Sequence, residues 1–305
     1  MIVVSGEALI DLIPTPTGEL KVSVGGAPFN TARWLGRLGQ PVRFLGAIAA
    51  DPLGRQIRRS LIECDVALDL VVDAPHLTTL ALAQLDATGA AQYTFYSDAT
   101  SVRDLTPESL PDNVMDGVDA IQVGGVGLTL EPSATAVELL VQRAHAAGAL
   151  VMLDPNVRPT LVDDPVAYTE RLARVVALTD VVKLSVDDVR WIAPDDDPVT
   201  RARVLLSSGP RAVLLTDGAN GTTVLTADLT KIVPAEPVTV VDTIGAGDAF
   251  GAGFLAHWLA NGRARADLND SALVVEAARH ATAVAGIACA HPGGTPPADL
   301  QQLLH

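Results

Sequence analysis

The stretch that decides the fold is Val238-Thr-Val-Val-Asp242-Thr-Ile-Gly245-Ala-Gly247-Asp248-Ala-Phe-Gly251-Ala-Gly253-Phe. Its β-branched residues predict a strand over residues 238–241, and the small and apolar residues that follow predict a helix over residues 249–260. The glycine-rich turn between them lets consecutive backbone N–H groups converge at the positive end of the helix dipole. We therefore predict an anion hole at Gly245, Ala246 and Gly247.

Asp248 follows this turn directly. Its carboxylate would face the bound anion and could accept the proton of an attacking hydroxyl, as phosphoryl transfer requires. The helix N-terminus is expected to lower the pKa of Asp248 and make it a weak base. The alternative is a structural role, because an Asp after a glycine-rich turn commonly caps a helix.

Short apolar runs alternate with amphipathic segments along most of the chain, which predicts a doubly wound α/β domain with a mainly parallel sheet. The other predicted strands are 2–5, 42–48, 120–123, 150–153, 181–184 and 212–216. The other predicted helices are 29–38, 133–147, 166–177, 200–207 and 271–288. We expect a single domain over residues 1–305.

The segment from Leu68 to Tyr96 breaks this alternation, because strand-like runs follow one another with a turn at residues 86–89 and no helix between them. It predicts a small antiparallel sheet that projects as a lid, with inserted lid strands at about residues 11–24 and 68–98. An ordinary hairpin at the sheet edge is the alternative.

The composition excludes several classes of protein. The 36 acidic and 21 basic residues give a net charge of −15, which argues against nucleic-acid binding and against an anionic membrane surface. Residues are 49% hydrophobic but only 4% aromatic, which suits an aliphatic core around a parallel sheet. The two cysteines lack metal or CxxC spacing, no uncharged apolar run is long enough for a membrane helix, and the N-terminus does not resemble a signal peptide. The expected location is the cytoplasm.

The common nucleotide-binding loops are missing from the sequence. It contains no Gly-Lys-Ser/Thr, so it has no P-loop, and the spacing GxGxxxG differs from the dinucleotide fingerprint GxGxxG. The residues after the first strand, Ser5-Gly6-Glu7-Ala8, make no phosphate-binding turn, which argues against an NAD-dependent oxidoreductase.

A second glycine-rich turn, Gly25-Gly26-Ala27-Pro28-Phe29-Asn30, lies near the start of the chain. Its glycines let a polyhydroxy ligand approach the backbone, and Asn30 offers two donors and an acceptor. Asp11 could accept hydrogen bonds from sugar hydroxyls. Taken alone, Asp11 could equally be a turn residue and Asn30 a polar residue on a helix surface.

The two turns together resemble the signatures of the ribokinase-like, or PfkB, family of carbohydrate kinases, and the likeness extends over essentially the whole chain. The resemblance implies a doubly wound α/β domain with a β lid over the sugar. It implies that Asp248 is the catalytic base and that Gly245, Ala246 and Gly247 form the anion hole. The implied sugar ligands are Asp11, Gly25, Gly26 and Asn30.

Further segments extend this resemblance toward the phosphates. Asp154-Pro-Asn156-Val-Arg158-Pro resembles a strand-end motif of fructokinases and ketodeoxygluconate kinases, which implies that Arg158 clamps the transferring phosphoryl group. Lys183-Leu-Ser185-Val-Asp-Asp188 aligns with an Asn-x-x-Glu segment that helps hold magnesium and phosphates. Its Ser-x-x-Asp pattern has shorter acceptors, which implies contact with the metal through water.

The resemblance also implies nucleotide and cation ligands. Thr216-Asp-Gly218-Ala-Asn-Gly221 is similar to the loop that holds ATP. The implied ATP-binding residues are Lys183, Ser185, Asp188, Thr216, Gly218 and Gly221. Asp242 and the carbonyl of Ile244 are the implied ligands of a monovalent cation, K+.

The predicted function is that of an ATP- and Mg2+-dependent kinase that phosphorylates a hydroxymethyl group of a small carbohydrate. D-fructose is the expected substrate, because the N-terminal segment and Tyr93-Thr-Phe-Tyr96 resemble the bacterial fructokinase branch. The alternatives are a 2-keto-3-deoxygluconate kinase, another sugar or nucleoside kinase of the family, and a non-catalytic sugar-binding regulator. Arg103 is the candidate to bind an acidic substrate near the lid. A homodimer through the lid is expected, as in several relatives.

Overall fold

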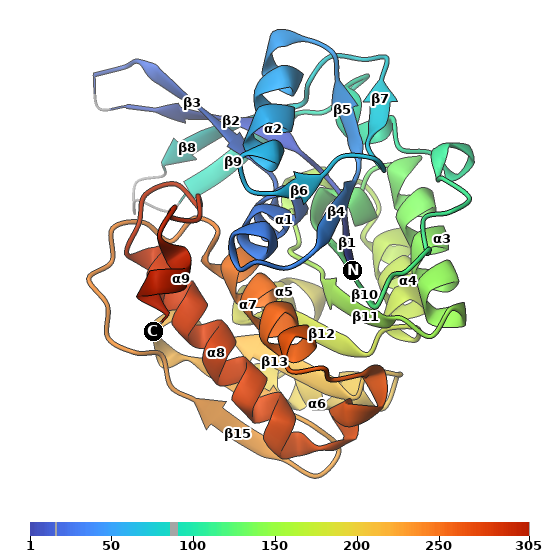
Figure 1. Cartoon of the computed structure of the whole chain (residues 1–305), viewed down its shortest axis with the longest axis vertical. Helices are drawn as coiled ribbons and strands as arrows, with labels where there is room; N and C mark the ends of the chain where they lie inside the picture. The colour runs from blue at the N-terminus through green and yellow to red at the C-terminus, as the bar shows by residue number, and fades with distance from the viewer. Residues whose placement is uncertain (16, 86–90, 305) are drawn as a thin grey trace.

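The structure is a computed structural model that describes residues 1–15, 17–85 and 91–304. A nine-stranded sheet runs through its centre (Figure 1). Its strands are, in spatial order, β15 (Thr230–Val233), β14 (Thr222–Leu225), β13 (Ala212–Thr216), β12 (Val181–Ser185), β11 (Leu150–Asp154), β10 (Ala120–Gly124), β1 (Ile2–Ser5), β4 (Val42–Leu45) and β6 (Val66–Ala67). The seven strands from β13 to β6 are parallel, and β14 and β15 are antiparallel.

Helices cover both faces of this sheet. One face packs against α1 (Ala27–Arg37), α2 (Pro52–Ile62), α7 (Ala246–Ala260) and α8 (Ser271–Cys289). The other face packs against α3 (Ser133–Ala146), α4 (Pro165–Val176), α5 (Val186–Ile192) and α6 (Pro198–Leu206). Strand β1 serves both layers, because Ile2 and Val4 point into one core and Val3 into the other. The predicted doubly wound α/β fold is confirmed.

A separate four-stranded sheet stands off from this body, at the upper left of Figure 1. Its order is β3 (Leu20–Gly25), β2 (Leu9–Pro14), β8 (Leu80–Leu85) and β9 (Ala91–Tyr96). The predicted segment 68–98 is not continuous in this sheet, because β7 (Val72–Ala74) pairs instead with β5 (Ala47–Ala49). The predicted turn at residues 86–89 lies outside the described residues.

The predicted strand at residues 238–241 is wrong. These residues lie in an extended loop, where Val238, Val240 and Val241 are 41%, 60% and 60% exposed. β-branched residues favour a strand only where a neighbouring strand offers hydrogen bonds and a surface for packing. Here the N–H groups of Val241 and Asp242 donate instead to the carbonyl of Cys289.

Three helices escaped the sequence prediction, namely α2, α5 and α9 (Leu300–Leu303), although the first two carry capping signals. Helix α2 begins after Asp51, whose carboxylate accepts from the N–H of Gly54. Helix α5 begins after Ser185, which forms a capping box with Asp188. Both caps fit the preference for short polar side chains at helix starts.

Helix α8 is long and apolar enough to cross a membrane by length and composition alone. In the fold it lies beside α7 (Figure 1), and Val274, Ala277 and Ala281 belong to the core of the sheet's first face. Its other side carries Glu276 and Arg279. A buried core helix passes the same test, so α8 is weak evidence for a membrane span.

Candidate active site

A cleft of about 630 Å³ opens at the carboxyl ends of the parallel strands, where α/β sheets bind ligands. The small sheet, the loops after β1, β11 and β12, and the start of α7 line it. It brings together most of the residues predicted from the sequence. These are Asp11, Gly26, Asn30, Arg158, Lys183, Ser185, Asp188, Thr216, Ile244, Gly245, Gly247 and Asp248.

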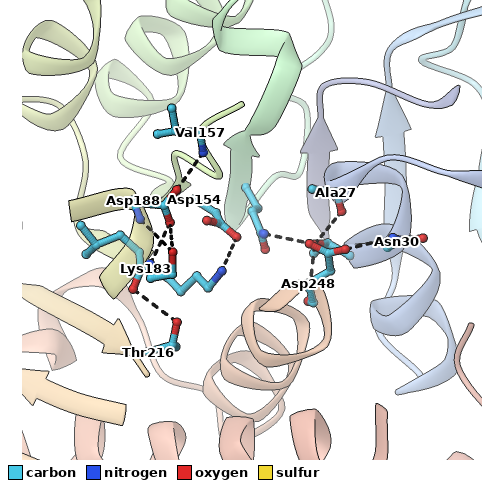
Figure 2. Close-up of polar contacts among 12 residues, drawn as sticks. Ala27, Asn30, Asp154, Val157, Lys183, Asp188, Thr216 and Asp248 are labelled. Carbon is cyan, nitrogen blue, oxygen red and sulfur yellow. Dashed lines mark hydrogen bonds and ion pairs between the residues drawn. The ribbon is translucent and has the colours of Figure 1, made fainter. Parts of the chain in front are cut away.

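Asp248 is the third residue of α7 and is 6% exposed. Its Oδ2 accepts a hydrogen bond of 2.9 Å from Nδ2 of Asn30 on α1 (Figure 2). The residue that caps α7 is Gly245, whose φ of +76° places it in the left-handed region. The alternative prediction of a helix cap at Asp248 is therefore wrong, and its carboxylate is available to the cleft.

Burial raises the pKa of Asp248 to about 6, although the hydrogen bond from Asn30 acts in the opposite direction. The nearby Asp154 also raises the pKa, while Lys183 and Arg158 lower it. The prediction that the helix N-terminus lowers this pKa is wrong, because removal of the carboxylate from water outweighs the dipole. Asp248 is therefore a stronger base than the sequence indicated, and it is ionised at neutral pH.

Lys183 and Asp154 form a buried ion pair (Figure 2). They come from the adjacent strands β12 and β11, and Nζ lies 2.7 Å from Oδ2 of Asp154. Burial alone would lower the pKa of Lys183, but Asp154, Asp188 and Asp248 together hold it above its ordinary value. A Cβ at Gly247 would lie 2.8 Å from Nζ, so the glycine lets this charge approach the turn before α7. Lys183 is a fixed cation rather than a solvated surface charge.

The carboxylate of Asp188 organises the loops on the phosphate side. Its Oδ2 accepts from the N–H (2.8 Å) and the hydroxyl (2.6 Å) of Ser185, and its Oδ1 accepts from the N–H of Val157 (2.8 Å). Figure 2 shows these contacts next to Thr216, which ends β13. Since both oxygens of Asp188 already accept protein donors, it is first of all a connector between the ends of β11 and β12.

The end of the cleft below the small sheet contains a second carboxylate, Asp11. It lies within β2 and pairs with Ser23 of β3, so it is not a turn residue, the alternative that the sequence left open. A Cβ at Gly25 would lie 2.0 Å from Oδ2 of Asp11, so Gly25 leaves room for this side chain. Burial raises the pKa of Asp11 to about 6, and Arg158 opposes that shift.

Six of the predicted residues are not in the wall of the cleft, as far as the described residues show. They are Gly25, Arg103, Gly218, Gly221, Asp242 and Ala246. Arg103 binds the carbonyls of Ser97 and Glu131 at 3.0 Å each, so it fixes loops instead of facing substrate. Gly218 and Gly221 lie in the turn between β13 and β14.

Asp242 also lies outside the wall of the cleft. Its Oδ1 accepts from the N–H of Ile244 (3.0 Å) and its Oδ2 from the N–H of Gly293 (2.8 Å). The loop that contains Gly293 and Gly294 also packs against the turn before α7, because a Cβ at Gly245 would lie 2.8 Å from Cα of Gly294. Asp242 therefore ties the loop before α7 to the loop after α8.

The sequence analysis missed Glu7, which also lines the cleft. It is 4% exposed, and burial raises its pKa to about 7. A charged residue immediately after a buried central strand was the available signal, because that position meets the ligand side of the sheet. Tyr93 and Phe95 of β9 line the cleft as well, with ring centroids 6.1 Å apart.

Comparison with known proteins agrees with this geometry. Residues 1–300 match the pfkB family carbohydrate kinase family. The protein belongs to the pfkB family. As the sequence predicted, it is therefore a carbohydrate kinase, a phosphotransferase with an alcohol group as acceptor.

Individual pfkB relatives resemble it over most of its length. A fructokinase of Rhizobium leguminosarum bv. trifolii is 39% identical over 260 residues, which are 84% of this chain and 79% of that protein. A structure of a fructokinase with bound ATP from Xylella fastidiosa has a TM-score of 0.91 and 29% identity, and covers 99% of this chain and 96% of that chain. An aminoimidazole riboside kinase from Salmonella enterica has a TM-score of 0.85 and 25% identity, over 100% and 99% of the chains.

Proposed function

We propose that this pfkB kinase transfers the γ-phosphoryl group of ATP to a primary hydroxyl of D-fructose. The observation that carries the proposal is the buried Asp248–Asn30 pair at the start of α7, next to the fixed charge of Lys183 and within one cleft with Asp11. The relatives named fructokinase support the choice of sugar.

The residues divide the reaction between them. The sugar hydroxyl attacks the γ-phosphorus, its proton passes to Oδ of Asp248, and the bond to the β-phosphate breaks to release ADP. Asn30 holds the carboxylate in place through its 2.9 Å bond. Lys183, Arg158 and the N–H groups at Gly245–Gly247 offset the negative charge of the phosphoryl group. A loose transition state needs only late proton removal, which suits a base with a pKa of about 6.

Magnesium fits the same side of the cleft. When bound, Mg2+ neutralises charge on the ATP phosphates, and in kinases it keeps several waters and few protein ligands. Asp187 and Asp188 line this part of the cleft and supply carboxylate oxygens, the type of donor that Mg2+ prefers. Because both oxygens of Asp188 accept protein donors, we infer that it would reach the ion through water. Binding of K+ at Asp242 and the carbonyl of Ile244 stays a prediction. Both carboxylate oxygens of Asp242 already accept hydrogen bonds from backbone N–H groups, which leaves fewer lone pairs for a cation.

The charges at the sugar end favour a neutral sugar. Glu7 and Asp11 line this end, and Arg158 is the cation that faces them. The carboxylate of 2-keto-3-deoxygluconate would lie among these acids. Arg103, its predicted partner, is held outside the cleft by backbone carbonyls.

The test is ADP release from Mg-ATP with D-fructose, 2-keto-3-deoxygluconate, ribose, adenosine, aminoimidazole riboside and fructose 6-phosphate, each with and without K+. We expect D-fructose to give the highest kcat/KM. A riboside or an acidic sugar as the best acceptor would overturn the choice of fructose. Silence with every sugar while ATP binds would favour a non-catalytic binder.

Asn30→Ala is expected to raise the KM for fructose and to shift the acid limb of kcat upward in pH. The hydrogen bond from Asn30 lowers the pKa of Asp248, so its loss raises that pKa and the base is protonated over a wider range. A bond to a charged group predicts a loss of about tenfold or more in kcat/KM. Steady-state kinetics from pH 5 upward test this, with the exposed Asn113→Ala as control. If neither the KM for fructose nor the acid limb of the pH profile of kcat changed, Asn30 would have no role in this site.

We also propose that the protein is cytoplasmic, because Cys64 and Cys289 are free thiols, as expected in a reducing compartment. We further propose that it forms a homodimer through the small sheet. Leu20 and Val22 on β3 and Tyr96 on β9 each expose about half of their surface, at 52%, 50% and 53%. Val22→Lys is expected to shift the protein toward monomer in size-exclusion chromatography with light scattering. A monomeric parent protein at micromolar concentration would contradict this assembly.

A further inference from the structure

Glu7 joins three parts of the protein at the floor of the cleft. It follows β1, the strand between β10 and β4. Its Oε1 accepts a hydrogen bond of 3.0 Å from the N–H of Ala27, the first residue of α1. Its Oε2 accepts a bond of 3.3 Å from the N–H of Gly127, in the 3₁₀ turn Gly125–Leu128. One carboxylate therefore connects the central sheet, helix α1 and a loop on the opposite side.

Helix α1 has no cap of its own. Its N-cap residue is Gly26, which offers no side chain, and Pro28 removes one N–H from the first turn. The first turn of α1 also contains no acidic residue, so a negative charge for the helix dipole has to come from elsewhere. Glu7 supplies both the acceptor and the charge from a distance of twenty residues in sequence.

The surrounding backbone is shaped to admit this carboxylate. Gly125 has a φ of +63°, and a Cβ there would lie 2.6 Å from Oε1 of Glu7. Gly26 has a φ of +112°, and a Cβ there would lie 2.6 Å from the carbonyl oxygen of Glu7. Two positions where only glycine fits without strain therefore surround one side chain.

Helix α1 carries Asn30, whose amide holds the catalytic carboxylate of Asp248. We propose that Glu7 is a positioning residue for phosphoryl transfer, which caps α1 from the end of β1 and thereby fixes Asn30 against Asp248. The inference rests on the proposed kinase function of this site. It assigns to Glu7 no contact with substrate.

The charge on Glu7 makes this role depend on pH. Burial raises its pKa to about 7, while the backbone N–H groups and Arg158 oppose the shift. The first turn of α1 and the 3₁₀ turn carry no charged side chain, and the other titratable or charged groups at this end of the cleft are Asp11, Tyr93, Arg158 and Asp248. Below its pKa Glu7 is protonated and accepts less strongly from Ala27 and Gly127. We therefore expect kcat/KM to fall on the acid side in two steps, near 7 for Glu7 and near 6 for Asp248.

Glu7→Gln tests the role, with Glu170→Gln on the exposed side of α4 as the matched control. The glutamine keeps one acceptor but no charge. We expect kcat/KM for the sugar to fall about tenfold, as for the loss of a hydrogen bond to a charged group, with the KM for ATP nearly unchanged. We also expect the acid limb to keep only the step near 6. In a double-mutant cycle, Glu7→Gln should add little to Asn30→Ala, because Glu7 acts through Asn30 and has nothing left to position once that amide is gone.

A readout without turnover separates this proposal from the proposed function. Hydrogen exchange of the first turn of α1, followed by mass spectrometry, should be faster in Glu7→Gln than in the parent protein and in Glu170→Gln. Protection that stays equal overturns the proposal even if fructose is phosphorylated, and absent activity with faster exchange rejects only the proposed function. Full additivity in the double-mutant cycle also overturns it. Should Glu7→Gln fail to fold, Glu7→Asp serves instead, because its shorter side chain keeps the charge but cannot reach the N–H groups of both Ala27 and Gly127. Protection of the first turn of α1 that equals that of the parent protein would then overturn the proposal.

Discussion

Asp248→Asn is expected to lower kcat by about 10²–10⁴-fold, the range that a positioned general base contributes. The substitution keeps the size of the side chain, and its carbonyl oxygen can still accept from Asn30. What it removes is the ability to take the proton of the sugar hydroxyl. The KM values for ATP and fructose should therefore remain nearly unchanged, which identifies an interaction made mainly in the transition state.

The pH dependence gives this prediction a second readout. Asp248 must be ionised to act as base, so activity should rise as the pH rises through about 6 in the parent protein. That step should be absent from the residual activity of Asp248→Asn. Asp163→Asn, in an exposed loop before α4, is the matched control. Activity within a few-fold of the parent protein would remove Asp248 as the base.

Lys183→Met is expected to have the second largest effect, because it changes both catalysis and stability. Removal of one preorganised charge next to the transferring group predicts a loss of about 10²–10³-fold in kcat. It also leaves Asp154 buried without its ion-pair partner, at 4% exposure. We expect the free energy of unfolding to fall by roughly 3–5 kcal/mol, as for other broken buried pairs.

The double variant Asp154→Asn/Lys183→Met separates these two effects. Without the buried carboxylate the penalty for an unpaired charge disappears, so urea unfolding should show most of the lost stability restored. The kcat should stay low, because the cation at the anion hole is still missing. Recovery of kcat together with stability would show that Lys183 has only a structural role.

Local patterns predicted much of the fold. Strands β1 and β13 match the predicted residues 2–5 and 212–216, because each is a short apolar run buried on both faces of the sheet. The strand predicted at residues 238–241 is also a short run rich in β-branched residues, yet none of the strands in the described part of the chain pairs with it. Composition indicates how readily a segment adopts an extended conformation. Whether it becomes a strand also depends on which other segments the fold places beside it.

The candidate site divides in the same way. The glycine turns indicated Asp248 and Asn30, because a turn at a helix start is a local feature of the sequence. The role of Glu7 depends on N–H groups at residues 27 and 127, which no local pattern connects to residue 7. The prediction for Arg103 was wrong for a related reason. Arg103 is close to the lid in sequence, but its side chain donates to the backbone carbonyls of Ser97 and Glu131, which the local sequence does not indicate.

The sequence by itself determined the α/β alternation, the two glycine-rich turns and the residue types of a phosphoryl-transfer site. These depend on side-chain periodicity and on backbone freedom at glycine, which act over a few residues. Only the tertiary structure decided the protonation of that site. The pKa of Asp248 lies above its ordinary value because elements far apart in the chain remove the carboxylate from water. The loss of hydration depends on how completely they enclose it, and no stretch of the sequence contains that information.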